Sequence, residues 1–121
     1  TVSVVINDNL DICYNMLRPM LALYIGGMGA RGKNFYTDLA GRYGFEAEAT
    51  EIQDLYLAGD KGMAMARVPA ELIDAVALVG PRERIRERLS IWRDSPVTTL
   101  NMTVFDVETL RTMVELVGEM E

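Results

Sequence analysis

The chain has 121 residues, enough for one domain with a modest core. Half of the residues are hydrophobic and a quarter are charged, which excludes an intrinsically disordered chain. The 18 acidic and 12 basic residues give a net charge of −6, so the chain as a whole does not attract nucleic acid or anionic lipid. No apolar run reaches the roughly 20 residues of a membrane-spanning helix. We therefore expect neither a nucleic-acid partner nor a membrane partner.

The residue types that are missing limit the chemistry. The chain contains no histidine and a single cysteine, Cys13. These counts exclude, within this chain, an internal disulfide, a Ser-His-Asp triad and most zinc sites. No metal site is predicted, and we expect Cys13 to be a small buried hydrophobe. Because no secretory signal is visible, we expect a cytoplasmic protein.

The chain opens with a pattern typical of a buried strand. Val2 to Ile6 is short, rich in β-branched residues and nearly all apolar, as in strands that are covered on both faces. The polar residues after it offer helix caps, so a helix is expected from Leu10 onward. Pro19 should kink this helix or start a second one, because it lacks the backbone N–H and clashes with the preceding turn. The helix should end at one of the glycines from Gly26 to Gly29.

The middle of the chain predicts short helices separated by glycine. Gly44 and Gly59 are well placed to end helices, and Asp60 to cap the next one. Pro69 fits the first position of a further helix. Together with the first helix, these segments form a predicted helical insertion over residues 10–75.

The last third predicts one more strand between two helices. Residues 76–79 form an apolar run whose type the sequence leaves open. A helix is expected over residues 81–93, a strand over residues 97–104 and a final helix over residues 106–118, capped by Asp106. The inward face of that last helix is predicted to carry Val107, Leu110, Val114 and Val117.

Strands separated by helices suggest an α/β fold with parallel pairing and crossover connections. We expect residues 1–121 to form a single unit with two parallel-type strands and predominantly helical connections. Two strands make a poor independent sheet, and unpaired edges favour association. The sequence therefore predicts missing neighbours or a homo-oligomer.

One stretch of the sequence suggests a binding site. Gly26 to Gly32 could cradle a phosphate with backbone N–H groups, yet it lacks both the G-x-G-x-x-G and the G-K-[ST] pattern. A helix end and tight turn is the favoured alternative. The residues that follow could line a substrate pocket or form a solvated loop leading into a helix; they are Arg31, Lys33, Asn34 and Tyr36.

The charged run from Arg82 to Arg88 has a simpler interpretation. Glu83 and Glu87 interleave its arginines, which favours a solvated helix face with local ion pairs over a nucleic-acid surface. No pair of carboxylates stands out as a general acid and base, so the catalytic residues are not predicted.

Several literal runs along the chain match the sequence of one known family. They include Arg18-Pro19, Tyr24-Ile25-Gly26-Gly27-Met28-Gly29, Lys33-Asn34-Phe35-Tyr36, Tyr43-Gly44-Phe45, Ile52-Gln53-Asp54-Leu55-Tyr56-Leu57-Ala58-Gly59, Val68-Pro69, Leu78-Val79-Gly80-Pro81 and Val97-Thr98-Thr99-Leu100. The chain thereby resembles the carboxyl-terminal part of luciferase-like oxidoreductases that use the deazaflavin coenzyme F420. Within that family it is similar to the branch described as methylenetetrahydromethanopterin reductase-like.

The resemblance implies the end of a (β/α)8 TIM barrel of the bacterial luciferase-like type. Val2 to Ile6 would be its seventh strand and residues 98–104 its eighth. The family binds the deazaflavin at the carboxyl ends of the barrel strands and transfers hydride between it and a small organic substrate. By position, Asn7 and Asp8 would face the barrel mouth. Weaker candidates for binding substrate or phosphate are Arg31, Lys33, Asn34 and Tyr36.

Three interpretations of function follow. The first is an F420-dependent oxidoreductase of which this chain is a part that is inactive alone, because the earlier strands supply much of the cofactor pocket. The start at Thr1, directly before a strand pattern, also suggests a fragment. The second replaces coenzyme F420 by FMN, as in a luciferase-like monooxygenase. The third is a non-catalytic fragment that associates with itself.

Overall fold

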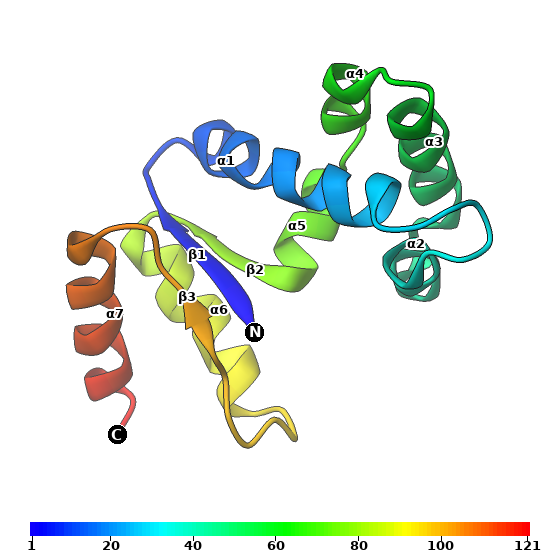
Figure 1. Cartoon of the computed structure of the whole chain (residues 1–121). Helices are drawn as coiled ribbons and strands as arrows, with labels where there is room; N and C mark the ends of the chain where they lie inside the picture. Colours follow the sequence, from blue (N-terminus) through cyan, green and yellow to red (C-terminus); the bar gives the residue numbers. More distant parts are fainter. The chain divides into compact units, whose positions relative to one another are not determined.

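The computed structural model describes all of residues 1–121 (Figure 1). The chain forms two compact units. One, the sheet unit, comprises residues 1–14 and 76–121, and the other, the helical unit, comprises residues 15–75. None of the helices combines the length and the apolar character that crossing a bilayer requires.

Three parallel strands form the sheet of the sheet unit. Strand β1 (Val2–Ile6) is central, β2 (Ala77–Gly80) pairs with one of its edges and β3 (Met102–Thr103) with the other, giving the order β2-β1-β3. The predicted strand β1 is confirmed, residue for residue. Its pairing with β2 runs from Ser3 opposite Ala77 to Ile6 opposite Gly80. The mixed α/β class with parallel strands and mostly helical connections is therefore confirmed.

Two predictions about strands are wrong. The prediction of two strands missed β2, since four apolar residues are too few to separate a buried strand from a helix by periodicity. The predicted strand over residues 97–104 shrinks to Met102–Thr103 because only Val2 and Ser3 of β1 pair with it. Strand β3 lies on the edge of β1 opposite β2.

Two helices cover the sheet and complete its core. Helix α6 (Arg82–Arg93) follows β2, and α7 (Val107–Glu119) follows β3 (Figure 1). Apolar side chains of the strands pack with one face of each helix. The buried cluster consists of Val2, Val4, Leu78, Ile85, Leu89, Met113 and Leu116.

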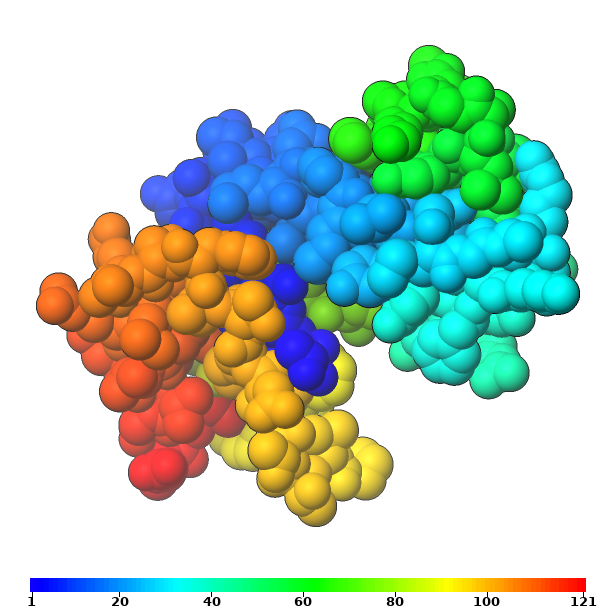
Figure 2. Space-filling view, in the orientation of Figure 1, coloured from blue at the N-terminus to red at the C-terminus, as the bar shows by residue number.

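Helix α7 turns a different face to the core from the one predicted. Asp106 caps it as expected, with Oδ1 accepting from the N–H of Thr109 at 2.7 Å. Thr109, Met113 and Leu116 are buried, whereas the four residues predicted to lie inside are exposed by 37–65%. This helix carries two apolar stripes, so periodicity alone could not tell which one meets the sheet. We call the exposed set (Val107, Leu110, Val114 and Val117) the outer stripe; α7, orange to red in Figure 2, lies open at the surface in this view.

The helical unit is a series of short helices. Helix α1 (Leu10–Ala22) begins in the sheet unit and continues into a π-helical turn, η1 (Leu23–Gly27). It runs through Pro19, so of the two alternatives expected there, a second helix starting at Pro19 is not observed. The chain then forms α2 (Phe35–Ala40), η2 (Gly41–Phe45), α3 (Glu46–Leu57), α4 (Lys61–Ala66) and α5 (Ala70–Val76).

The helix ends in this unit follow the predicted signals. Gly44 and Gly59 adopt φ values of 97° and 90°, a region in which glycine carries no Cβ penalty. Asp60 caps α4 by accepting from the N–H of Met63 at 3.2 Å. Buried side chains of α3 and its neighbours, including Ala49 and Ile52, fill the interior.

Candidate functional site

The carboxyl edge of the parallel sheet places Asn7 and Asp8 at the end of β1. The N–H of Asn7 donates to the carbonyl of Gly80 at 3.1 Å, so both residues lie where β1 and β2 end together. The side chain of Asn7 is engaged in a local turn, with Oδ1 accepting from the N–H of Asn9 at 2.8 Å. Asp8 is exposed, and its carboxylate makes no polar contact. Of the two candidates, Asp8 is the one whose side chain is available to a ligand.

A guanidinium that the sequence analysis did not single out also belongs to this edge. Strand β2 ends at Gly80 with φ 119°, and a Cβ there would lie 2.8 Å from Cδ of Arg84. Nη1 of Arg84 donates to the carbonyl of Val79 at 2.6 Å. The sequence did carry a signal that could have revealed this arrangement: Gly80 stands four residues before Arg84, which lies in the first turn of a helix. Gly80 thus leaves room for the Arg84 stem against the end of the strand.

Cys13 lies beneath this edge and is confirmed as a buried residue. Its Sγ lies 3.6 Å from the carbonyl oxygen of Val5 and 3.7 Å from that of Asn7, to which the thiol donates weakly. The side chain is fully buried, and desolvation raises the pKa of the thiol. A raised pKa disfavours the thiolate, so Cys13 is not suited to act as a nucleophile.

In the helical unit, Asn34 has a structural role. Its Oδ1 accepts from the N–H groups of Tyr36 at 2.9 Å and Thr37 at 3.3 Å, which caps α2. Its Nδ2 donates to the carbonyls of Tyr24 at 3.1 Å and Ile25 at 3.0 Å at the end of the first helical segment. With 1% exposure and both halves of its amide bonded, Asn34 is not available to a ligand.

The other three candidates of this segment are exposed. Arg31 forms an ion pair with Asp54 of α3. Tyr36 packs edge to face against Tyr24, with ring centroids 4.8 Å apart. Lys33 is exposed, and its ammonium group has no partner. Among these candidates, Lys33 is the free cation.

The glycines of the segment Gly26 to Gly32 serve mainly close packing. A Cβ on Gly26 or Gly27 would lie 2.5 Å from carbon atoms of Tyr56 on α3. A Cβ on Gly29 would lie 2.6 Å from the carbonyl oxygen of Lys33. These approaches explain the glycines without a bound phosphate, which favours the helix end and tight turn over the phosphate cradle.

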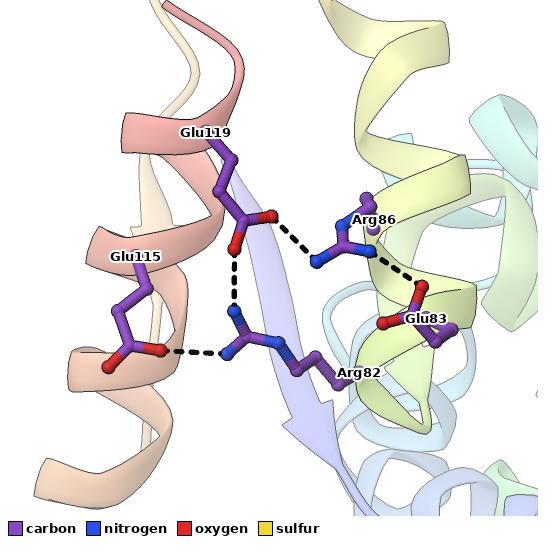
Figure 3. A network of polar contacts seen from close by, with 5 residues as sticks. All are labelled: Arg82, Glu83, Arg86, Glu115 and Glu119. Carbon is purple, nitrogen blue, oxygen red and sulfur yellow. Dashed lines mark hydrogen bonds and ion pairs between the residues drawn. The ribbon is translucent and has the colours of Figure 1, made fainter.

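Two arginines of α6, Arg82 and Arg86, form ion pairs with α7, and Arg86 also forms one within its own helix (Figure 3). Arg82 contacts Glu115 and Glu119, both at 2.9 Å. Arg86 contacts Glu119 and Glu83, both at 2.7 Å. The carboxylates raise the pKa of Arg82, chiefly through the hydrogen bond that its guanidinium donates to Glu115. The predicted solvated face with local ion pairs is confirmed, and it also joins two helices.

Comparison with known proteins places this architecture in a family. Residues 1–99 match the luciferase-like monooxygenase family. The chain is 34% identical, over 117 residues, to a Mycobacterium tuberculosis protein whose name assigns it, by inference, the activity of a coenzyme F420-dependent oxidoreductase. The chain therefore belongs to the luciferase-like monooxygenase family, as the resemblance implied.

The match covers nearly all of this chain but only part of the relative. It covers 97% of this chain but 34% of the relative, so the chain spans about a third of that protein's length. No solved structure matches the chain significantly. No three acidic or cysteine side chains lie close enough together to bind a metal ion.

Proposed function

We propose that these 121 residues are the carboxyl-terminal part of an oxidoreductase that transfers hydride between coenzyme F420 and a small organic substrate. The observation that carries the proposal is the 34% identity to a relative named for F420 dependence, along nearly the whole chain. Family membership over residues 1–99 supports the same class of activity. Because the chain spans about a third of the relative, we propose that it is inactive alone.

The proposal includes a barrel for the longer protein. Parallel strands whose carboxyl ends meet at one edge are the building pattern of such barrels. The resemblance assigns β1 and β3 to consecutive barrel strands, and the parallel pairing of β3 with Val2 and Ser3 of β1 supports that assignment.

The fit of the cofactor can be judged from the side chains. A deazaflavin supplies a ring that accepts or donates hydride, and the protein supplies orientation and charge. Lys33 and Asp8 are the two candidate residues with free charged groups, one in each unit. Lys33 suits an anionic group of the cofactor or substrate, whereas Asn34 does not because its amide is fully bonded. Asp8 suits a hydroxyl or amine donor.

The test is a fluorescence titration of coenzyme F420 with two proteins. The first is this chain alone, and the second is a longer protein that contains this chain together with the remaining two thirds of the relative's length. We expect binding to the longer protein, and reduction of the cofactor only there. A matched titration with FMN tests the second interpretation. Binding of FMN in preference to F420 would replace the deazaflavin proposal, and binding of neither would refute both.

Self-association is a separate proposal. The outer stripe of α7 and the free edge of β3 expose apolar surface and unpaired backbone groups, which favour contact with another copy. We propose a homo-oligomer in the cytoplasm, with no nucleic acid or membrane partner. Light scattering tests the first part, and a monomer at all concentrations would contradict it.

A further inference from the structure

The outer stripe of α7 borders two apolar hollows of the sheet unit. One hollow, of about 440 Å³, is lined by three side chains of the stripe and by Met102 and Val104 of the β3 segment. The other, of about 380 Å³, lies between the ends of α6 and α7 and has Trp92 in its wall. Val117 lines both hollows, so the stripe and the hollows form one continuous apolar surface. A continuous exposed apolar surface is typical of a protein–protein contact.

We infer that this surface joins two copies of the chain about a twofold axis, with their α7 helices antiparallel. The inference rests on the self-association proposed above and names its interface. The residues of the outer stripe follow one another at intervals of three, four and three residues, a spacing that is the same from either end. A twofold axis at the centre of the stripe, position 112, sets Val107 against Val117 of the second copy. Leu110 then lies against Val114 of the second copy, so each stripe covers the other.

The charges beside the stripe also favour an antiparallel second copy. Arg111 is exposed and forms no ion pair, and Glu115 uses only Oε2 in its contact with Arg82. About an axis at position 112, Arg111 lies opposite position 113 of the second copy, about 3 Å along the helix from Glu115 of that copy. An ion pair between the two copies is therefore within reach on each side of the axis. In a parallel pair, Arg111 would instead face Arg111, and like charges repel.

The area that a stable dimer needs extends the contact beyond the stripe. A specific interface buries about 800 Å² per partner, more than the four partly exposed side chains of the stripe supply. Side chains of the second copy must therefore also enter the hollow beside β3. Strand β3 is an edge strand, and the twofold axis that reverses α7 also reverses β3. The two β3 edges are thereby set antiparallel, an arrangement in which their unpaired backbone groups can bond.

The first test is disulfide formation between cysteines at the two ends of the stripe. Cys13 is fully buried and does not compete. Val107→Cys chains and Val117→Cys chains, mixed under reducing conditions and then oxidised with diamide, should give a disulfide-linked dimer on a non-reducing gel. Either variant alone should not, because its two cysteines would lie about 15 Å apart along the helices, too far for a disulfide. Rapid linkage of either variant alone would indicate a parallel pair and overturn the inference, as would a mixture that does not link.

The second test uses two lysine variants in sedimentation velocity. Val114→Lys places a charge inside the contact and should raise the Kd of the dimer by about tenfold or more. Ile91→Lys, at a residue of α6 that is 62% exposed and lines neither hollow, should dimerise as the parent does. Circular dichroism checks that both variants are folded.

The outcomes separate the interface from the association itself. Equal dimerisation of the parent and Val114→Lys would overturn the inferred interface and leave the self-association standing. A parent that is monomeric at all concentrations would overturn both. Binding of coenzyme F420 is measured separately, so neither outcome bears on the proposed oxidoreductase.

Discussion

Replacing Asn34 by alanine should destabilise the helical unit by about 2–3 kcal/mol. Loss of the cap to Tyr36 and Thr37 costs about 1 kcal/mol. Loss of the donor leaves the carbonyl of Tyr24 without its bond from Nδ2, at about 1–2 kcal/mol. The carbonyl of Ile25 suffers less because it keeps the hydroxyl of Thr37 as a donor.

The assay is urea unfolding followed by two signals. Far-ultraviolet circular dichroism reports all helices, whereas the fluorescence of Trp92, the only tryptophan, reports the sheet unit. Hydrogen exchange at the N–H groups of Tyr36 and Thr37 should accelerate in Asn34→Ala, because both lose their acceptor.

A second variant divides the two halves of the amide. Asn34→Asp keeps an acceptor for the cap and adds a negative charge that the helix N-terminus favours. It loses the donor, however, and sets a carboxylate against the carbonyls of Tyr24 and Ile25. We expect it to be destabilised despite the intact cap. If Asn34→Ala lowers the free energy of unfolding by less than about 0.5 kcal/mol, the structural role is refuted and Asn34 is again a candidate for binding substrate or phosphate.

Three further predictions concern the sheet unit. Gly80→Ala should lower the free energy of unfolding in urea titrations by about 2 kcal/mol, because φ of residue 80 is 119° and the new Cβ would collide with Arg84. The control is Gly118→Ala, inside α7 with open space around it, which should raise the free energy of unfolding by about 0.5–1 kcal/mol. The free energy of unfolding should fall as pH rises above 9.0, because the Cys13 thiol ionises at its ordinary pKa in the unfolded chain, whereas burial raises its pKa in the folded chain. Cys13→Ala should remove this part of the pH dependence. Identical plots of unfolding free energy against pH for the parent and Cys13→Ala would contradict the raised pKa. Arg82→Gln should lower the melting temperature slightly at low salt and hardly at about 1 M salt, since the ion pairs that it removes are exposed; a loss that is independent of salt would point to packing instead.

The sequence predicted best the features that depend on neighbours in the chain. Strand β1, the caps at Asp60 and Asp106, and the helix ends at Gly44 and Gly59 all appear where local chemistry placed them. Each rests on a residue type acting within a few positions, such as a carboxylate that accepts from an N–H three residues on. Strand β2 was left open because a strand of four residues is defined by its partner, here β1.

The candidate site shows the same division. The sequence identified exposed polar residues, and Asp8 and Lys33 are indeed exposed with free charges. It could not show that Asn34 turns inward, because its partners Tyr24 and Ile25 lie ten and nine residues away, respectively.

The sequence by itself determined the family, the α/β class with parallel strands, and most helix boundaries, since these follow from literal segments, hydrophobic periodicity and local capping. Only the tertiary structure decided which of two apolar stripes of α7 meets the sheet and which edge of β1 receives β3. Both choices depend on the free energy of burying one surface against another. That energy belongs to pairs of segments distant in the chain, and no local pattern contains it.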